Sequence, residues 1–173
     1  MRKKIIKITL WILVIIWMIT ILSFSSESAE FSDNKSRTIV QIIMPLIEKL
    51  NIEISIDQLN HYIRKTAHIF NYFLLSILLT IAWRLSFTNK AKYTAPYIIA
   101  TIFSAIDEFF QTFINGRGGR LSDVMIDNIG ILLALLLIYL ITREPRGRFS
   151  WPTKFLLLQQ IYRASIISLQ SRS

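Results

Sequence analysis

Four apolar blocks, each close to 20 residues long, dominate the sequence and limit the folds that it can adopt. They occupy residues 5–24, 67–85, 95–113 and 124–141. A helix of about 20 residues crosses a hydrocarbon core of roughly 30 Å. In lipid, backbone polar groups need partners within their own segment, so we expect helices rather than strands. The blocks therefore predict an all-α fold, a polytopic membrane helical bundle with four transmembrane helices.

The composition agrees with a membrane protein and excludes several other classes. Of the 173 residues, 53% are hydrophobic and 18% are charged, against about 25% charged residues in an average soluble domain. A soluble enzyme and a disordered chain are both disfavoured. Cysteine is absent, which removes disulfides, thiolate metal sites and cysteine nucleophiles.

The first block has a second interpretation, as a cleaved signal peptide. It follows three basic residues at 2–4 and precedes the small residues Ser26, Ser28 and Ala29. Its apolar run is longer than the roughly 7–15 residues of a signal core, which favours a retained membrane helix.

The distribution of basic residues predicts the orientation in the membrane. With the amino terminus inside, the inner pieces hold 13 of the 20 Lys and Arg residues and the outer pieces hold 7. Basic residues gather on the cytoplasmic side, so we expect both termini in the cytoplasm. The net charge of +9 is then explained by basic residues at the inner surface, which attract anionic lipid of the inner leaflet. Nucleic acid is not needed to explain it.

Two segments outside the blocks show amphipathic patterns. In the outer segment 25–66, apolar residues recur at helical spacing from Ile39 to Leu50, interrupted by Pro45, and a second short pattern covers 56–63. The basic tail at 143–173 has a similar pattern. Such segments are expected as short interfacial helices. For the tail, a free segment is the alternative.

Polar side chains gather at the predicted outer ends of three blocks. Asp107 and Glu108 stand out, because one central acid costs roughly 2.5–3.5 kcal/mol in a membrane and two adjacent acids also repel. We expect Arg64, His68, Arg117 and Arg120 to be their partners. Two interpretations stay open: a structural ion-pair network, or a ligand site built on it, which we favour. His61 is interpreted as a surface residue. The candidate ligand-binding residues are Arg64, Lys65, His68, Tyr72, Asp107, Glu108, Gln111, Arg117, Arg120, Asp123 and Asp127.

These residues resemble the motifs of the VanZ-like family of membrane proteins. The run RKTAH at 64–68, followed by Tyr72, resembles the family's arginine-lysine-x-alanine-histidine motif. The run DEFFQ at 107–111 is similar to its aspartate-glutamate-x-x-glutamine motif, and Phe24-Ser25-Ser26 to a weaker signature. The residues similar to the final motif are Gly116, Arg117, Asp123, Asp127 and Gly130. Asn71 departs from the pattern, since glutamate is common there.

The resemblance covers about residues 10–140 and implies a bacterial cell membrane. With the apolar blocks and the basic residues, it predicts a four-helix membrane domain over residues 1–142 and a basic cytoplasmic tail at 143–173. It also implies a link with resistance to the lipoglycopeptide teicoplanin. This antibiotic acts on lipid-linked wall precursors at the outer face of the bacterial cell membrane. No reaction, cofactor or metal follows from it.

Two classes of function remain. In the first, which we favour, the basic residues bind an anionic lipid or a lipid-linked cell-wall precursor, since arginine pairs with phosphate oxygens bidentately. In the second, an enzyme acts on a lipid-linked phosphate. His68 with Asp107 or Glu108 would then do acid–base chemistry, or the carboxylates would hold Mg²⁺ or another hard cation.

Overall fold

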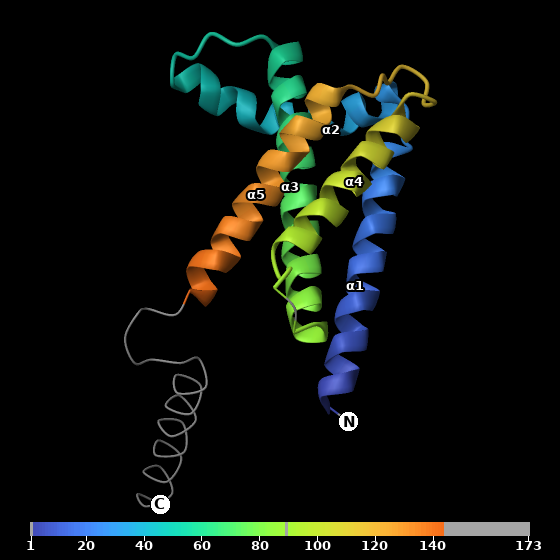
Figure 1. Cartoon of the computed structure of the whole chain (residues 1–173). Coiled ribbons are helices and arrows are strands. Elements are labelled where there is room, and N and C mark those ends of the chain that lie inside the picture. The colour runs from blue at the N-terminus through green and yellow to red at the C-terminus, as the bar shows by residue number, and fades with distance from the viewer. Residues whose placement is uncertain (1, 89, 144–173) are drawn as a thin grey trace, which may run out of the picture. The chain divides into compact units, whose positions relative to one another are not determined.

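The computed structural model describes residues 2–88 and 90–143, and the regular elements there are five α-helices (Figure 1). They are α1 (Arg2–Ser25), α2 (Ala29–Lys49), α3 (Ile56–Ser86), α4 (Thr94–Gln111) and α5 (Leu121–Thr142). The chain divides into two compact units, Met1–Ile138 and Tyr139–Ser173. The buried core and the cavity both lie within the first unit. All of the predicted amphipathic tail except residue 143 lies outside the described residues.

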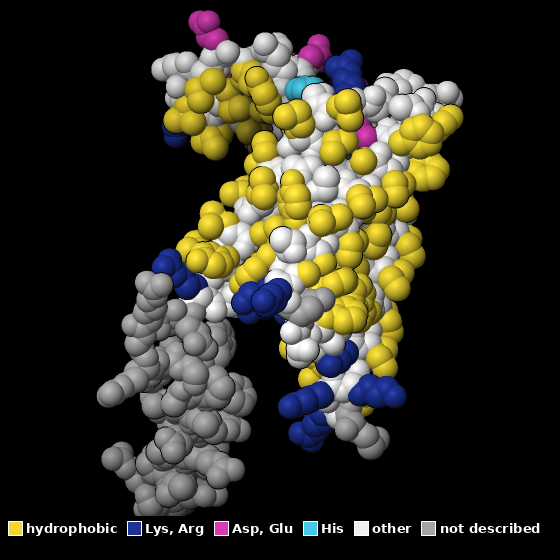
Figure 2. Space-filling view, viewed as in Figure 1, with side chains coloured by type: hydrophobic (Ala, Val, Ile, Leu, Met, Phe, Trp, Pro, Cys, Tyr) yellow, Lys and Arg dark blue, Asp and Glu magenta, His cyan; other side chains and the backbone are white. Residues whose placement is uncertain are grey.

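Three of the described helices are long and apolar enough to cross a membrane: α1, α3 and α5. Figure 2 shows apolar side chains over the visible face of the bundle, between one end that carries Lys and Arg and another end that carries acidic residues and histidine together with Lys and Arg. The fourth predicted span, α4, has 18 residues and carries Asp107, Glu108 and Gln111 near its end. The all-helical fold is therefore confirmed, whereas the count of four transmembrane helices is not.

The third helix begins earlier than the sequence pattern suggested. Residues 56–63, expected as a separate short helix, are continuous with the apolar block in α3. A capping box starts α3: Gln58 N donates to Ser55 Oγ (3.2 Å), and Ser55 N donates to Gln58 Oε1 (3.0 Å). No glycine or proline follows until the helix ends. Arg64 and His68 therefore lie inside a long helix rather than at its start.

Residues 29–49 of the outer segment form one helix, α2, which lies across one end of the bundle (Figure 1). It runs through Pro45 without a break, and Ser28 caps its start. Ile39, Ile42 and Leu46 are exposed on it, as expected for an amphipathic helix. The helical part of that prediction is confirmed.

The core of the unit brings α1, α3, α4 and α5 together. Val14 and Ile21 of α1 belong to one buried cluster that also holds Leu75 of α3, Phe103 of α4 and Ile131 of α5. Burial of such side chains against one another gives the helices a defined arrangement.

A glycine sets the distance between α5 and α3. A Cβ at Gly130 would overlap the carbonyl oxygen of Ile69. Two turns further along α3, Ser76 Oγ donates to the carbonyl oxygen of Ile131, the residue that follows Gly130 (3.3 Å). This close approach places Asp127 beside His68.

Candidate functional site

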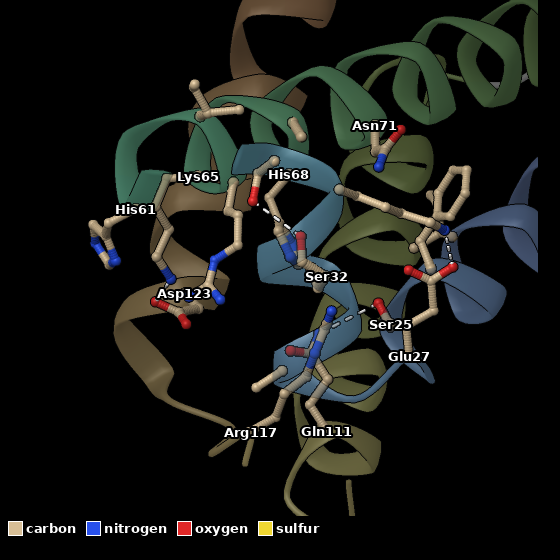
Figure 3. Close-up of a pocket in the computed structure, with 18 of the residues that line it drawn as sticks. Ser25, Glu27, Ser32, His61, Lys65, His68, Asn71, Gln111, Arg117 and Asp123 are labelled. Carbon is tan, nitrogen blue, oxygen red and sulfur yellow. Dashed lines mark hydrogen bonds and ion pairs between the residues drawn. The ribbon is translucent and has the colours of Figure 1, made fainter. Parts of the chain in front are cut away.

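A cavity of about 580 Å³ opens at the end of the bundle where α2 lies (Figure 3). Its wall comes from the end of α1, from α2, from the first turns of α3 and from the segment between α4 and α5. The polar lining includes Ser25, Glu27, Ser32, Lys35, His61, Arg64, Lys65, His68, Tyr72, Gln111, Arg117, Arg120 and Asp123. The apolar lining includes Ile21, Phe24, Ile39, Ile63 and Phe70. The cavity thus has polar and apolar wall sections.

Two basic residues of α3 are neutralised by acids. Arg64 forms an ion pair with Asp33 of α2. Lys65 Nζ lies 2.6 Å from Asp123 Oδ1, and in Figure 3 the two side chains point toward one another. These pairs connect α2 and α5 to α3 at the cavity wall.

Arg117 is different, because it has no acidic side chain within ion-pair distance among the residues that the structure describes. It is half-buried in the cavity wall beside Gln111 and Ser25 (Figure 3). Burial, followed by repulsion from the Arg64 guanidinium, lowers the pKa of Arg117 from its ordinary value. The cavity therefore holds a cation that protein charges compensate only weakly.

Glycines shape the segment that carries Arg117. Gly116 has a φ of +74°, a left-handed conformation that other residues rarely adopt. A Cβ at Gly119 would overlap the carbonyl oxygen of Glu108. Ala29 N donates to the carbonyl oxygen of Asn115 (3.2 Å), which fixes the segment against the start of α2.

Behind the wall, Asp107 of α4 is fully buried, with 0% exposure. Three groups donate to its Oδ2: Ser25 Oγ at 2.8 Å, Tyr72 OH at 3.1 Å and Gln111 Nε2 at 3.3 Å. Its Oδ1 has no hydrogen-bond partner within the described part of the chain. Hydrogen bonds from three cavity-lining residues thus hold this carboxyl group just outside the cavity.

A second buried cluster joins α3, α4 and α5. His68 Nδ1 lies 3.4 Å from Asp127 Oδ1, and Ser104 Oγ donates to Asp127 Oδ2 (2.6 Å). Glu108, 4% exposed, accepts from the backbone N–H of Arg120 at 3.2 Å through Oε2. Potential ligand atoms of His68, Glu108 and Asp127 all lie within 4.8 Å of one another. Within the part of the chain that the structure describes, these three residues could hold a metal ion.

Comparison with known proteins decides the family. The sequence model of the VanZ/LLP1 family matches residues 10–142. The chain belongs to the VanZ/LLP1 family. Neither the search of curated proteins nor the search of solved structures found a match. Family membership and the apolar helices together point to a membrane protein, and VanZ membership suggests a link with glycopeptide resistance.

In this VanZ/LLP1 protein, eight of the eleven predicted site residues line the cavity. Asp107, Glu108 and Asp127 are buried outside its wall. His61, interpreted from sequence as a surface residue, is exposed and also lines the cavity. The eight are Arg64, Lys65, His68, Tyr72, Gln111, Arg117, Arg120 and Asp123.

The expected partners of the buried acids are only partly present. His68 pairs with Asp127, as expected. The expectation that Arg64 would also pair with these acids is wrong, because Arg64 pairs with Asp33 on the helix that crosses the end of the bundle. Arg120 reaches Glu108 through its backbone N–H and not through its guanidinium.

Sequence reasoning missed three residues that hold the site together. The sequence pattern includes Ser25 only in a weak signature and assigns no role to Ser104. A small polar residue three positions before Asp107 on an apolar helix was the available signal for Ser104. Asp33 gave no local signal, because its partner Arg64 is 31 positions away.

Proposed function

We propose that this protein crosses the bacterial cell membrane four times, with both termini in the cytoplasm and the cavity facing outward. The excess of basic residues in the pieces assigned to the inside supports this orientation. The 18 residues of α4 rise about 27 Å, close to the thickness of a hydrocarbon core. In this arrangement α2 lies at the outer interface, with Ile39, Ile42 and Leu46 available to lipid.

We propose further that the cavity binds an anionic lipid headgroup or a phosphate-bearing envelope intermediate. Arg117 carries this proposal, as a half-buried cation in the cavity without an acidic partner among the described residues. A guanidinium offers a planar pair of donors that matches phosphate oxygens. Arg64 and Lys65 are compensated by Asp33 and Asp123, so they contribute less net attraction.

The apolar part of the cavity supports a lipid rather than a free anion. Phe24, Ile39 and Phe70 line it together with the polar groups, and all three are partly exposed. An amphipathic ligand could place its headgroup near Arg117 and its chain along these residues. A lipid-linked wall precursor bound in this way would be less available to teicoplanin, which is our explanation for the link with resistance.

The test is a lipid-binding measurement on the purified full-length protein in detergent. Phosphatidylglycerol and an undecaprenyl phosphate should be retained in native mass spectra, and phosphatidylcholine should not. Arg117→Ala should weaken retention about tenfold or more, because hydrogen bonds to charged groups contribute roughly 1.5–3 kcal/mol.

Arg37→Ala is the matched control. Arg37 lies on α2, pairs with Asp57 at 3.6 Å and does not line the cavity. It should bind lipid as the wild type does. Equal retention of all three lipids by the wild type would reject the proposal.

A second candidate is an enzyme that acts on a lipid-linked phosphate. The His68–Asp127 pair, at 3.4 Å, is the observation that favours it, since a carboxylate can orient a histidine for proton transfer. This candidate would be supported if the wild type released phosphate from undecaprenyl pyrophosphate and His68→Gln did not. Absence of turnover would leave the binding function as the better description.

A further inference from the structure

The buried cluster behind the cavity contains the donor set of a metal site. His68 comes from α3, Glu108 from α4 and Asp127 from α5, so three separate helices supply one side chain each. Their potential ligand atoms lie within 4.8 Å of one another. A first-row cation with bonds of about 2.1 Å holds neighbouring ligand atoms roughly 3–4 Å apart. Small side-chain rotations would bring the three groups to that spacing.

Asp127 gives an independent indication of a ligand. It is fully buried, and its Oδ1 has no hydrogen-bond partner within the described residues, although it lies 3.4 Å from His68 Nδ1. Ser104 holds the other oxygen, Oδ2, at 2.6 Å. Hydrogen bonds of this kind orient ligating carboxylates in metal sites. The hydrogen bond from Ser104 thereby directs Oδ1 of Asp127 toward the His68 imidazole.

The buried carboxylates around His68 also lack enough positive charge nearby, which favours a bound cation. Asp107, Glu108 and Asp127 have exposed fractions of 0%, 4% and 0%. The nearby basic residues do not compensate them, because Arg64 pairs with Asp33 and Lys65 with Asp123. One imidazole is the only group with a possible positive charge in ion-pair contact with any of the three acids in the described parts of the chain. Buried carboxylates of this kind need a counter-charge or a proton.

We propose that His68, Glu108 and Asp127 bind a divalent transition-metal cation, Zn²⁺ or Mn²⁺. The imidazole favours Zn²⁺ over Mg²⁺ and Ca²⁺, which prefer oxygen ligands alone, and the two carboxylates also suit Mn²⁺. This site goes beyond the lipid-binding proposal, since it requires no lipid and uses residues other than Arg117. Its position behind the cavity wall would let the cation attract a phosphate from below while Arg117 contacts it from the side.

The proposal is tested with metal alone. Purified full-length protein in detergent is stripped with EDTA and titrated with Zn²⁺ by calorimetry and with Mn²⁺ by electron paramagnetic resonance. We expect one ion per chain, and a thermal unfolding temperature that rises with metal concentration, because an ion that binds the folded state stabilises it. Absence of binding by the wild type up to about 1 mM of either ion would overturn the proposal.

Three variants locate the site. Asp127→Asn and Glu108→Gln keep the side-chain shape and should abolish binding and the metal-dependent rise in unfolding temperature. Ser104→Ala should weaken the metal affinity about tenfold, because Ser104 orients a ligating carboxylate through a hydrogen bond. Glu27→Gln is the control, because Glu27 lines the cavity but lies outside the cluster. Wild-type binding by Asp127→Asn would also overturn the proposal.

Arg117→Ala separates this inference from the lipid-binding function. It should bind the metal like the wild type while losing anionic lipid. A protein that binds metal but no lipid would reject only the proposed function, and one that binds lipid but no metal would reject only the metal site.

Discussion

At the scale of single residues, the described cavity lining contains ion-paired basic residues and two arginines, Arg117 and Arg120, without an acidic partner. Arg64 and Lys65 are each fixed by an acid, while Arg117 faces the cavity without one in the described structure. A charge fixed by a neighbouring acid mainly joins helices, whereas an unpaired one attracts an anion. This is why the proposed anion binding depends on Arg117.

Substitution of Arg117 by lysine tests the planar guanidinium directly. The lysine keeps the charge and loses the paired donors that match phosphate. We expect Arg117→Lys to impair teicoplanin resistance nearly as much as Arg117→Ala, measured as the minimum inhibitory concentration in a strain that depends on this protein. If the lysine variant behaves as wild type while the alanine variant fails, a simple charge suffices.

Tyr72 provides a second residue-scale prediction, because its hydroxyl donates to the buried Asp107 Oδ2 at 3.1 Å. Tyr72→Phe should lower the free energy of unfolding by about 1–3 kcal/mol, since it leaves a buried acceptor less satisfied. The measurement is denaturant unfolding in detergent. Tyr62→Phe is the control, because Tyr62 is exposed and should leave stability unchanged. An unchanged Tyr72→Phe protein would mean that Ser25 and Gln111 satisfy Asp107 alone.

At the scale of elements, the site depends on how closely α5 approaches α3. Gly130 lies against the backbone at Ile69, and three positions before it Asp127 meets His68. The polar pairing and the close packing therefore come from the same stretch of α5. A change that separates the two helices should also separate the histidine from the carboxylate.

Gly130→Ala tests this coupling between packing and site. The added Cβ would overlap the carbonyl oxygen of Ile69, so we expect a loss of about 1–3 kcal/mol in unfolding free energy. Gly118→Ala is the matched control, because nothing lies within 4 Å of a Cβ at that position. Similar unfolding curves for the two variants would show that α5 can shift away from α3 without cost.

At the scale of the whole molecule, the central prediction is the orientation in the membrane. The native chain has no cysteine, so single cysteines can be introduced without background. A cysteine at Asn115 should react with a membrane-impermeant maleimide on intact cells, and one at Lys90 should not. Labelling at Lys90 with protection at Asn115 would reverse the topology and place the cavity in the cytoplasm.

The sequence by itself determined the all-helical fold and the end of the bundle at which the polar groups gather. Apolar blocks of about 20 residues can satisfy their backbones in lipid only as helices. Successive antiparallel helices then bring the end of one block next to the start of the following one. That is why eight predicted residues from separate segments line one cavity.

Only the tertiary structure decided which groups pair. Pairing depends on the rotation of each helix about its axis and on the distance between axes, which apolar blocks do not specify. Arg64 meets Asp33 because α2 folds back over α3, and Asp127 reaches His68 because Gly130 allows a close approach. Within the described residues, Arg117 is left without an acidic partner for the same reason. The acids expected to pair with it, Asp107, Glu108 and Asp127, accept hydrogen bonds from other groups behind the cavity wall.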